Sequence, residues 1–175
     1  VAVATGSDGQ VLTSTGAGSP PAFEAAAAGG KVLQLVSTTK DDAFNTSSTS
    51  LTDITGLTLN ITPSASSSKI LIFANISSSY RNYMSTFQLV RGSTNIAIGA
   101  SSDTFRGTTA RYAEGVGNSL SVTNHSFNFL DSPSTSSQTT YKIQVKVNGG
   151  SIYINDRSNG DGSFISTITA MEIGA

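Results

Sequence analysis

From Lys31 onward, apolar and polar residues alternate with a period of two, and no other feature constrains the fold as strongly. The clearest case is Tyr141–Val147, where one set of side chains is apolar and the other consists of Lys and Gln. This pattern is typical of a β-strand with one buried face, because successive side chains point to opposite sides of a sheet. Similar segments between Gly, Asn, Ser or Pro turns predict strands over 31–37, 52–61, 69–76, 85–91, 94–98, 119–122, 126–130, 151–154 and 164–173.

Many short strands with essentially no helix predict an all-β fold, a jelly-roll β-sandwich of about 8–10 antiparallel strands with a short extended N-terminal segment. We expect an extended, intertwined segment with an Ala/Gly hinge over 1–30 and the jelly-roll domain over 31–175. Because the sequence begins with Val rather than Met, we expect it to be the end of a longer protein or to have lost its start.

Composition argues against several classes of protein. The net charge of −1 gives no electrostatic basis for binding nucleic acid or an anionic membrane. No apolar run approaches the ~20 residues of a membrane-spanning helix. Low net charge with 37% hydrophobic residues argues against disorder. The sequence has no cysteine, which excludes disulfides and thiolate chemistry.

The segment Lys69–Ile76 departs from simple alternation, because both of its expected faces are apolar. One face carries Ile70, Ile72 and two further apolar residues, and the other carries Leu71 and Phe73. In a two-sheet sandwich the second face of such a strand must be covered. Either a loop of the same chain or another subunit could cover it, and in the second case Leu71 and Phe73 belong to a subunit interface.

The N-terminal segment Gly6–Phe23 cannot bury enough apolar surface to fold alone, since an isolated hairpin is marginal in water. It makes sense where identical copies wrap around a shared axis, with Val11, Leu12 and Phe23 packed there. Its pattern is G-x-x-G-Q-V-L-x-S-x-G followed by P-x-aromatic. This pattern resembles the short repeat that precedes the distal domains of bacteriophage tail-fibre and related virion fibre proteins.

The main domain carries a second resemblance. Its motifs are Leu57–Ile61, Ser67–Ile72, Tyr141–Val145 and the closing Ile168–Ile173. They look like a common distal domain of phage fibres, a jelly-roll head similar in shape to tumour-necrosis-factor and C1q domains. The resemblance implies a homotrimer in a phage particle, joined to other virion proteins through its N-terminal side.

Catalytic or metal chemistry finds little support in the sequence. His125 is the only histidine, and we expect an ordinary surface or strand residue. The segment Asn155–Gly162 lacks the regular carboxylate spacing of a calcium loop, so a long hairpin turn is the better interpretation. No spacing marks a pair of facing carboxylates. We therefore expect no enzyme activity, no cofactor and no metal, with a small polysaccharide-cleaving enzyme as a remote alternative.

Two aromatic and basic clusters are candidate receptor contacts, because Tyr and Arg offer large contact areas with polar groups. Their residues are Tyr80, Arg81, Tyr83, Arg106, Arg111 and Tyr112. The alternative is that they pack on a neighbouring subunit or on the edge of a sheet. The sequence thus favours a trimeric adhesion head that binds a host surface glycan or protein, without nucleic acid or membrane insertion. The alternative is a purely structural capsid decoration or capsid fibre protein.

Overall fold

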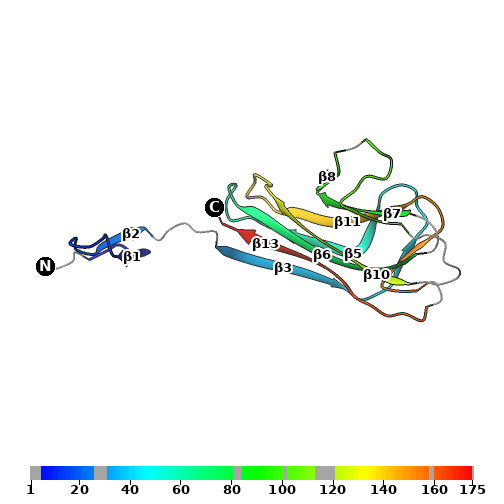
Figure 1. Ribbon diagram of the computed structural model, residues 1–175, viewed down its shortest axis with the longest axis horizontal. Coiled ribbons are helices and arrows are strands. Elements are labelled where there is room, and N and C mark those ends of the chain that lie inside the picture. The colour runs from blue at the N-terminus through cyan, green and yellow to red at the C-terminus, as the bar shows by residue number, and fades with distance from the viewer. Residues whose placement is uncertain are drawn as a thin grey trace.

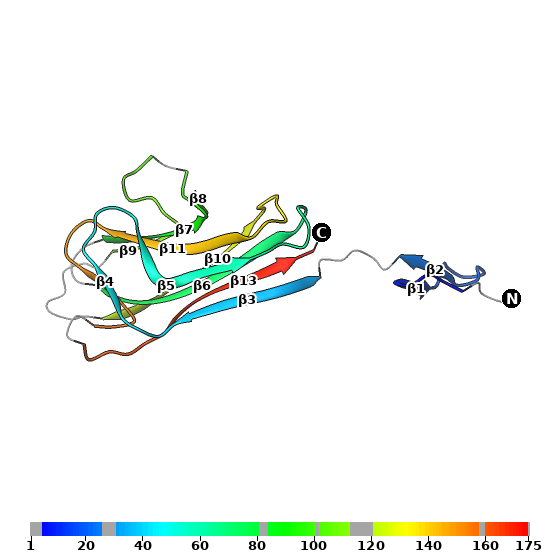
Figure 2. The same ribbon diagram turned by 180° about the vertical axis from the view of Figure 1, so that it is seen from behind.

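The computed structural model describes residues 5–25, 31–80, 84–100, 102–112, 121–157 and 160–174, with only the backbone at 111 and 112. These residues form a small N-terminal hairpin and a long β-sandwich (Figures 1 and 2). The strands are β1 (Gln10–Thr13), β2 (Ala22–Ala25), β3 (Val32–Lys40), β4 (Phe44–Thr46), β5 (Thr52–Ile61), β6 (Lys69–Tyr80), β7 (Met84–Arg91), β8 (Thr94–Ile96), β9 (Thr109–Tyr112), β10 (Val122–Asp131), β11 (Thr139–Val147), β12 (Ile152–Ile154) and β13 (Ser166–Ile173). Within these ranges, no helix has the length and apolar character needed to cross a membrane.

The sandwich consists of two antiparallel sheets, which confirms the predicted jelly-roll class. Sheet I has the order β3-β13-β6-β10. Beyond the end of the β13 pairing, β12 pairs with the last residues of β6, and β4 pairs with β12. Sheet II has the order β5-β11-β7, followed by β8 and β9 on the free edge of β7. The alternating segments predicted as strands supply the long members of both sheets, because each has one apolar side for the core.

The core lies between the two sheets. Sheet I contributes Ile70, Ile72, Ile76 and Ile168, and sheet II contributes Leu57, Leu59, Phe87, Leu89, Ile143 and Val145, all buried. Within Lys69–Ile76, the isoleucine face points into this core as expected. The face with Leu71 and Phe73 points outward and stays partly exposed.

The two ends of the sandwich are formed by different strand ends. The neck end holds the start of β3 and the end of β13, which pair at Val32 and Ile173, and the N-terminal hairpin lies on this side (Figure 1). The distal end holds the end of β6 at Tyr80 and the start of β7 at Met84. The long strands therefore separate the hairpin from the distal loops by the full length of the sandwich.

Some sequence-based expectations were wrong. No strand was predicted between residues 98 and 119, but residues 109–112 form β9 and pair with the start of β7. Residues 155–162 are not a hairpin turn, because β12 pairs with β4 and β6 whereas β13 pairs with β3 and β6. In the N-terminal segment, Ala22–Ala25 forms β2, so the expected hinge lies largely in the undescribed residues.

The loop between β8 and β9 folds back over the outer side of β7. Thr108 anchors it, since its N–H donates to the Phe87 carbonyl (2.9 Å) and its hydroxyl accepts from the Leu89 N–H (2.9 Å). Gly107 lies so close to β7 that a Cβ there would stand 2.3 Å from Thr86 Cγ2 and 2.7 Å from the Phe87 carbonyl oxygen. The covered side of β7 is accordingly buried, including the polar residues Thr86 and Gln88.

Gly107→Ala is expected to lower the free energy of unfolding by about 2 kcal/mol, because the added methyl group forces the loop away from β7. Urea unfolding at fixed protein concentration measures the change. Gly99→Ala is the matched control in the same loop, since a Cβ there meets nothing within 4 Å. Equal stabilities for the two variants would contradict the close packing of this loop.

Candidate interaction surface

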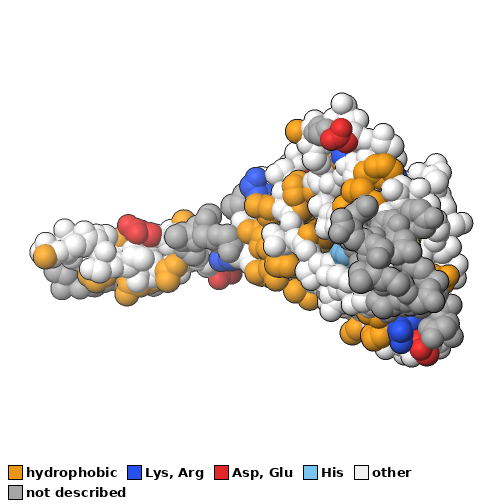
Figure 3. Space-filling model, turned by 45° about the vertical axis from the view of Figure 1, so that its right-hand side comes forward, with side chains coloured by type: hydrophobic (Ala, Val, Ile, Leu, Met, Phe, Trp, Pro, Cys, Tyr) orange, Lys and Arg blue, Asp and Glu red, His pale blue; other side chains and the backbone are white. Residues whose placement is uncertain are grey.

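The outer face of sheet I carries an apolar row close to the neck end. Leu35, Met171, Leu71 and Leu130 stand opposite one another on β3, β13, β6 and β10. Phe73 lies in the adjacent row on β6. Leu35, Leu130 and Phe73 are 58%, 49% and 42% exposed, respectively. Hydrophobic side chains gather on the sandwich beside the narrow N-terminal extension (Figure 3). We call Leu35, Leu71, Phe73, Leu130 and Met171 the neck patch.

Toward the distal end, the outward positions of the same face become polar. In the row of Phe73, its neighbours across the sheet are Ser37, Thr169 and Asn128. The next row consists of Thr39, Thr167, Asn75 and Ser126. Two depressions of about 310 and 500 Å³ lie here and share Asn75. Amides, hydroxyls and nearby apolar side chains line them, without a Lys, Arg, Asp or Glu. We call this area the amide patch.

The five predicted interface residues all have exposed or half-exposed side chains. Leu71 and Phe73 belong to the neck patch, and the described loops leave them partly uncovered. Val11, Leu12 and Phe23 lie on the hairpin, where Leu12 and Phe23 are direct cross-strand partners. The structure thus provides two partly exposed apolar surfaces, one on the hairpin and one on the neck side of sheet I.

The structure does not place the predicted receptor residues together on one surface. Tyr80 is not a surface residue, because β6 continues to it and buries it, with its hydroxyl donating to the Gly149 carbonyl. Arg81 and Tyr83 lie outside the described residues. Arg106 is exposed in the β8–β9 loop. For Arg111 and Tyr112 only the backbone is described, and register places Tyr112 opposite Met84 at the distal end.

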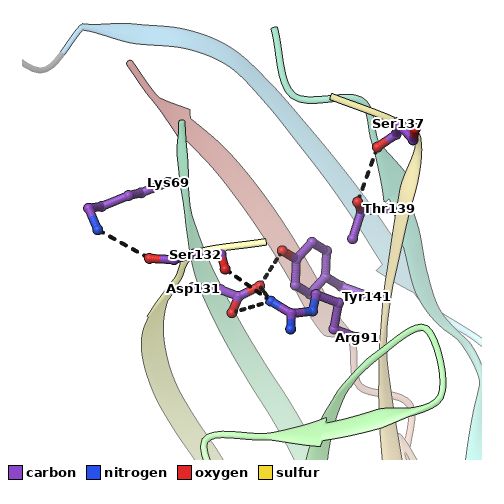
Figure 4. A network of polar contacts seen from close by, with 7 residues as sticks. All are labelled: Lys69, Arg91, Asp131, Ser132, Ser137, Thr139 and Tyr141. Atoms are coloured by element: carbon purple, nitrogen blue, oxygen red, sulfur yellow. Dashed lines mark hydrogen bonds and ion pairs between the residues drawn. The ribbon is translucent and has the colours of Figure 1, made fainter. Parts of the chain in front are cut away.

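A polar network at the neck end joins the two sheets (Figure 4). Asp131, at the end of β10, accepts two hydrogen bonds from Arg91 Nη1 on β7 (2.9 and 2.8 Å). It accepts a third from the Tyr141 hydroxyl on β11 (2.6 Å). Burial and the Asp131 carboxylate both raise the pKa of Tyr141, so the phenol keeps its proton and remains a donor.

Glu172 forms a second buried network at the same end. Its carboxylate accepts from the backbone N–H and the hydroxyl of Ser64 (2.7 and 2.6 Å) and from the Gln34 amide (2.7 Å). Burial alone would raise the pKa of this carboxyl, but the hydrogen bonds outweigh it and hold the pKa at about 2. The sequence alone does not indicate either network, because no local pattern marks partners as distant as Ser64 and Glu172.

The groups considered for chemistry have structural partners. His125 lies on β10 but is buried rather than on the surface, with Nε2 3.0 Å from the Ser78 hydroxyl and its ring 4.7 Å from the Phe87 ring. Lys40 is buried and bonded to Asp42 at 2.6 Å. The described residues hold no group of three or more His, Cys, Asp or Glu side chains that could bind a metal ion. His125 and Lys40 thus each have a structural contact within the chain.

The known structures similar to this chain are distant in sequence. No family model matches the sequence, and no curated protein matches it. Similar solved structures include the T13 viral particle of infectious bursal disease virus, with 11% identity, a TM-score of 0.41 and coverage of 95% of this chain and 44% of that one. The VP2 subviral particle of the same virus matches with 11% identity, a TM-score of 0.39 and coverage of 98% and 50%. The chain spans half or less of these proteins, and a likeness this weak supports no inference about function.

Proposed function

We propose that this chain is the distal part of a virion fibre, a homotrimer that displays an adhesion site to a host surface. The two-ended layout is the observation that supports the proposal most. Exposed apolar side chains occupy the hairpin and the neck end, where copies and other virion proteins would join. The loops of the opposite end then point away from the particle, as a display surface requires.

Adhesion would work through multivalency rather than catalysis. Three heads on one axis present three identical weak sites, and linked sites gain avidity without any new contact. Asp42, Asp53, Asp131 and Glu172 are each bonded to a cation or a hydrogen-bond donor of the same chain, which fits structural roles for these carboxylates. The proposed protein is therefore a virion component without enzyme activity.

The second candidate is a purely structural capsid decoration or capsid fibre without a receptor role. The burial of Tyr80 favours it, because this position no longer offers contact area to a receptor. The two candidate functions share the same assembly, and they differ only in whether the chain contacts a receptor.

Adsorption to host cells separates these candidates. Particles carrying Arg81→Ala, Tyr83→Ala and Arg106→Ala together are expected to adsorb at least about tenfold more slowly, because each trimer loses all three copies of the contact. Particles carrying Thr58→Ala, an exposed position on the outer face of β5, serve as the control. Unchanged adsorption by intact triple-variant particles would favour the structural role.

A further inference from the structure

We propose that the larger depression of the amide patch binds a neutral saccharide. This depression has a volume of about 500 Å³, and Asn75, Ser77, Asn124, Phe164 and Ile165 are among the residues that line it. We call it the distal depression. The inference rests on the proposed adhesion function for its biological setting, and it names a ligand class for that function. Binding itself can be tested on the chain without a particle or a host cell.

The distal depression lies at the end of the sandwich that would face the host under the proposed function. One wall is the start of β10, where Val122 pairs with Ser79 close to the end of β6. The other wall is the segment 163–165, which leads into β13. Leu71 and Phe73, the predicted interface residues on β6, are not among its lining residues. A contact between copies through those two side chains is thus separate from the ligand site.

Two asparagine amides form the polar part of the distal depression. Asn75 on β6 and Asn124 on β10 both have exposed side chains. Asn124 Oδ1 accepts from the Ser77 hydroxyl (2.8 Å), and Asn75 Oδ1 accepts from the Ser126 hydroxyl (3.2 Å). These bonds orient the amides, and their NH₂ groups have no hydrogen-bond partner among the described residues. An amide held in this way can donate to a ligand hydroxyl without first losing a bond within the chain.

Phe164 and Ile165 form the apolar part. Ile165 is 57% exposed, and the Phe164 side chain is half-buried. Backbone contacts hold this wall, because the Phe164 N–H donates to the Asn155 carbonyl (3.1 Å) and the Ser77 hydroxyl lies 3.0 Å from the Ile165 carbonyl oxygen. Gly162 lies against the ring, since a Cβ there would stand 2.6 Å from Phe164 Cε2. The ring therefore has a fixed position, which lowers the entropic cost of packing a ligand on it.

Oriented amides beside a fixed apolar wall match the chemistry of a sugar ring. One face of a hexose carries C–H groups that pack on an aromatic or aliphatic side chain, and its rim carries hydroxyls that donate and accept hydrogen bonds. The volume also lies in the range of roughly 300–1,000 Å³ that is typical of small-ligand sites. A purely apolar ligand would leave the two amides unpaired.

Charge selects a neutral saccharide. The residues that line the distal depression carry no ionisable side chain. Arg157 and Asp161, which precede Phe164 in the chain, form an ion pair with each other (3.2 Å). A sialic acid carboxylate or a phosphate would find no cation among the lining residues, and it would lose hydration without compensation.

The test is titration of the 175-residue chain with methyl glycosides, followed by saturation-transfer NMR. The neutral probes are the methyl glycosides of glucose, galactose, mannose and N-acetylglucosamine, and methyl sialoside is the charged comparison. We expect saturable binding of at least one neutral probe with a dissociation constant of about 1–10 mM, as for a weak single site, and no binding of the sialoside.

Two variants test the residues that carry the inference. Asn75→Ala combined with Asn124→Ala, and separately Phe164→Ala, are each expected to weaken binding at least about tenfold. Asn60→Ala is the matched control, because Asn60 is an exposed amide on sheet II whose Oδ1 also accepts from a hydroxyl, that of Thr140 (2.6 Å). The substituted side chains are exposed or half-buried, so circular dichroism should show unchanged folding.

Three results would overturn the inference. The first is no saturable binding of any neutral probe up to about 100 mM. The second is binding that the asparagine and Phe164 variants leave unchanged. The third is preferred binding of the sialoside that Arg106→Ala abolishes, which would place the ligand in the β8–β9 loop.

Particle adsorption reports on the proposed function separately. Glycoside binding that Phe164→Ala abolishes, with unchanged adsorption of particles carrying that variant, would leave the inference standing and remove its part in adhesion. Adsorption that the distal loop variants reduce, without glycoside binding by the chain, would keep the adhesion function and overturn the inference.

Discussion

Asp131→Ala is expected to lower the free energy of unfolding by about 3–4 kcal/mol. The carboxylate is 6% exposed and receives hydrogen bonds from Arg91 and Tyr141, which belong to the opposite sheet. Removing it leaves a phenol and a guanidinium without their acceptor in a partly buried site. An unpaired buried polar group costs more than the net value of the bond it has lost.

Urea unfolding at a fixed protein concentration measures this loss, because assembly makes stability depend on concentration. Asp53→Ala is the matched control, since Asp53 forms an ion pair of similar length with Lys142 but its side chain is 50% exposed. That ion pair should contribute no more than about 1 kcal/mol to the free energy of unfolding. Similar losses for the two variants would show that the Asp131 network does not join the sheets as described.

Glu172 is expected to make the stability of the chain depend on pH in the acid range. Its pKa lies at about 2 in the folded protein, below the ordinary value of 4.5. At about 1.4 kcal/mol for each pKa unit, this difference corresponds to about 3–4 kcal/mol. Because the folded-state pKa is the lower one, the stabilisation is fully present above about pH 5 and is lost as the pH falls toward 2.

Thermal unfolding of the wild type and Glu172→Gln between pH 7 and pH 2 tests this expectation. The variant should be less stable at pH 7 and should lose less stability than the wild type on acidification, because Gln cannot be protonated in this range. Its hydrogen bonds from Ser64 can persist, so it should still fold. Parallel pH profiles for the two proteins would contradict the assignment of the low pKa to this buried carboxylate.

The alternation of apolar residues predicted the class of fold and most of the long strands. It also predicted that β6 has a second apolar face, and the exposed Phe73 shows that the described loops leave this face partly uncovered. Period-two patterns work here because each long strand has one side in a single core. Short strands such as β9 lack that pattern, since they depend on pairing with β7 rather than on their own apolar face.

The distal end of β6 shows why the candidate site was harder to predict. Ser77, Ser78 and Ser79 resemble a polar loop, so Tyr80 was expected on the surface. These serines are instead buried, and their hydroxyls bond to groups far away in the sequence, including the Ile165 and Asp156 carbonyls. Asp131 and Glu172 were missed for the same reason. A buried polar residue is recognised only once the fold has brought its partners to it.

We expect this chain to assemble as a trimer around the axis of its N-terminal hairpin, as the proposed function requires. Sedimentation equilibrium of the 175-residue chain at micromolar concentration measures its mass in solution directly. We predict three chain masses, stable on dilution through this range. A single chain mass under these conditions would contradict the shared axis and the multivalent display together.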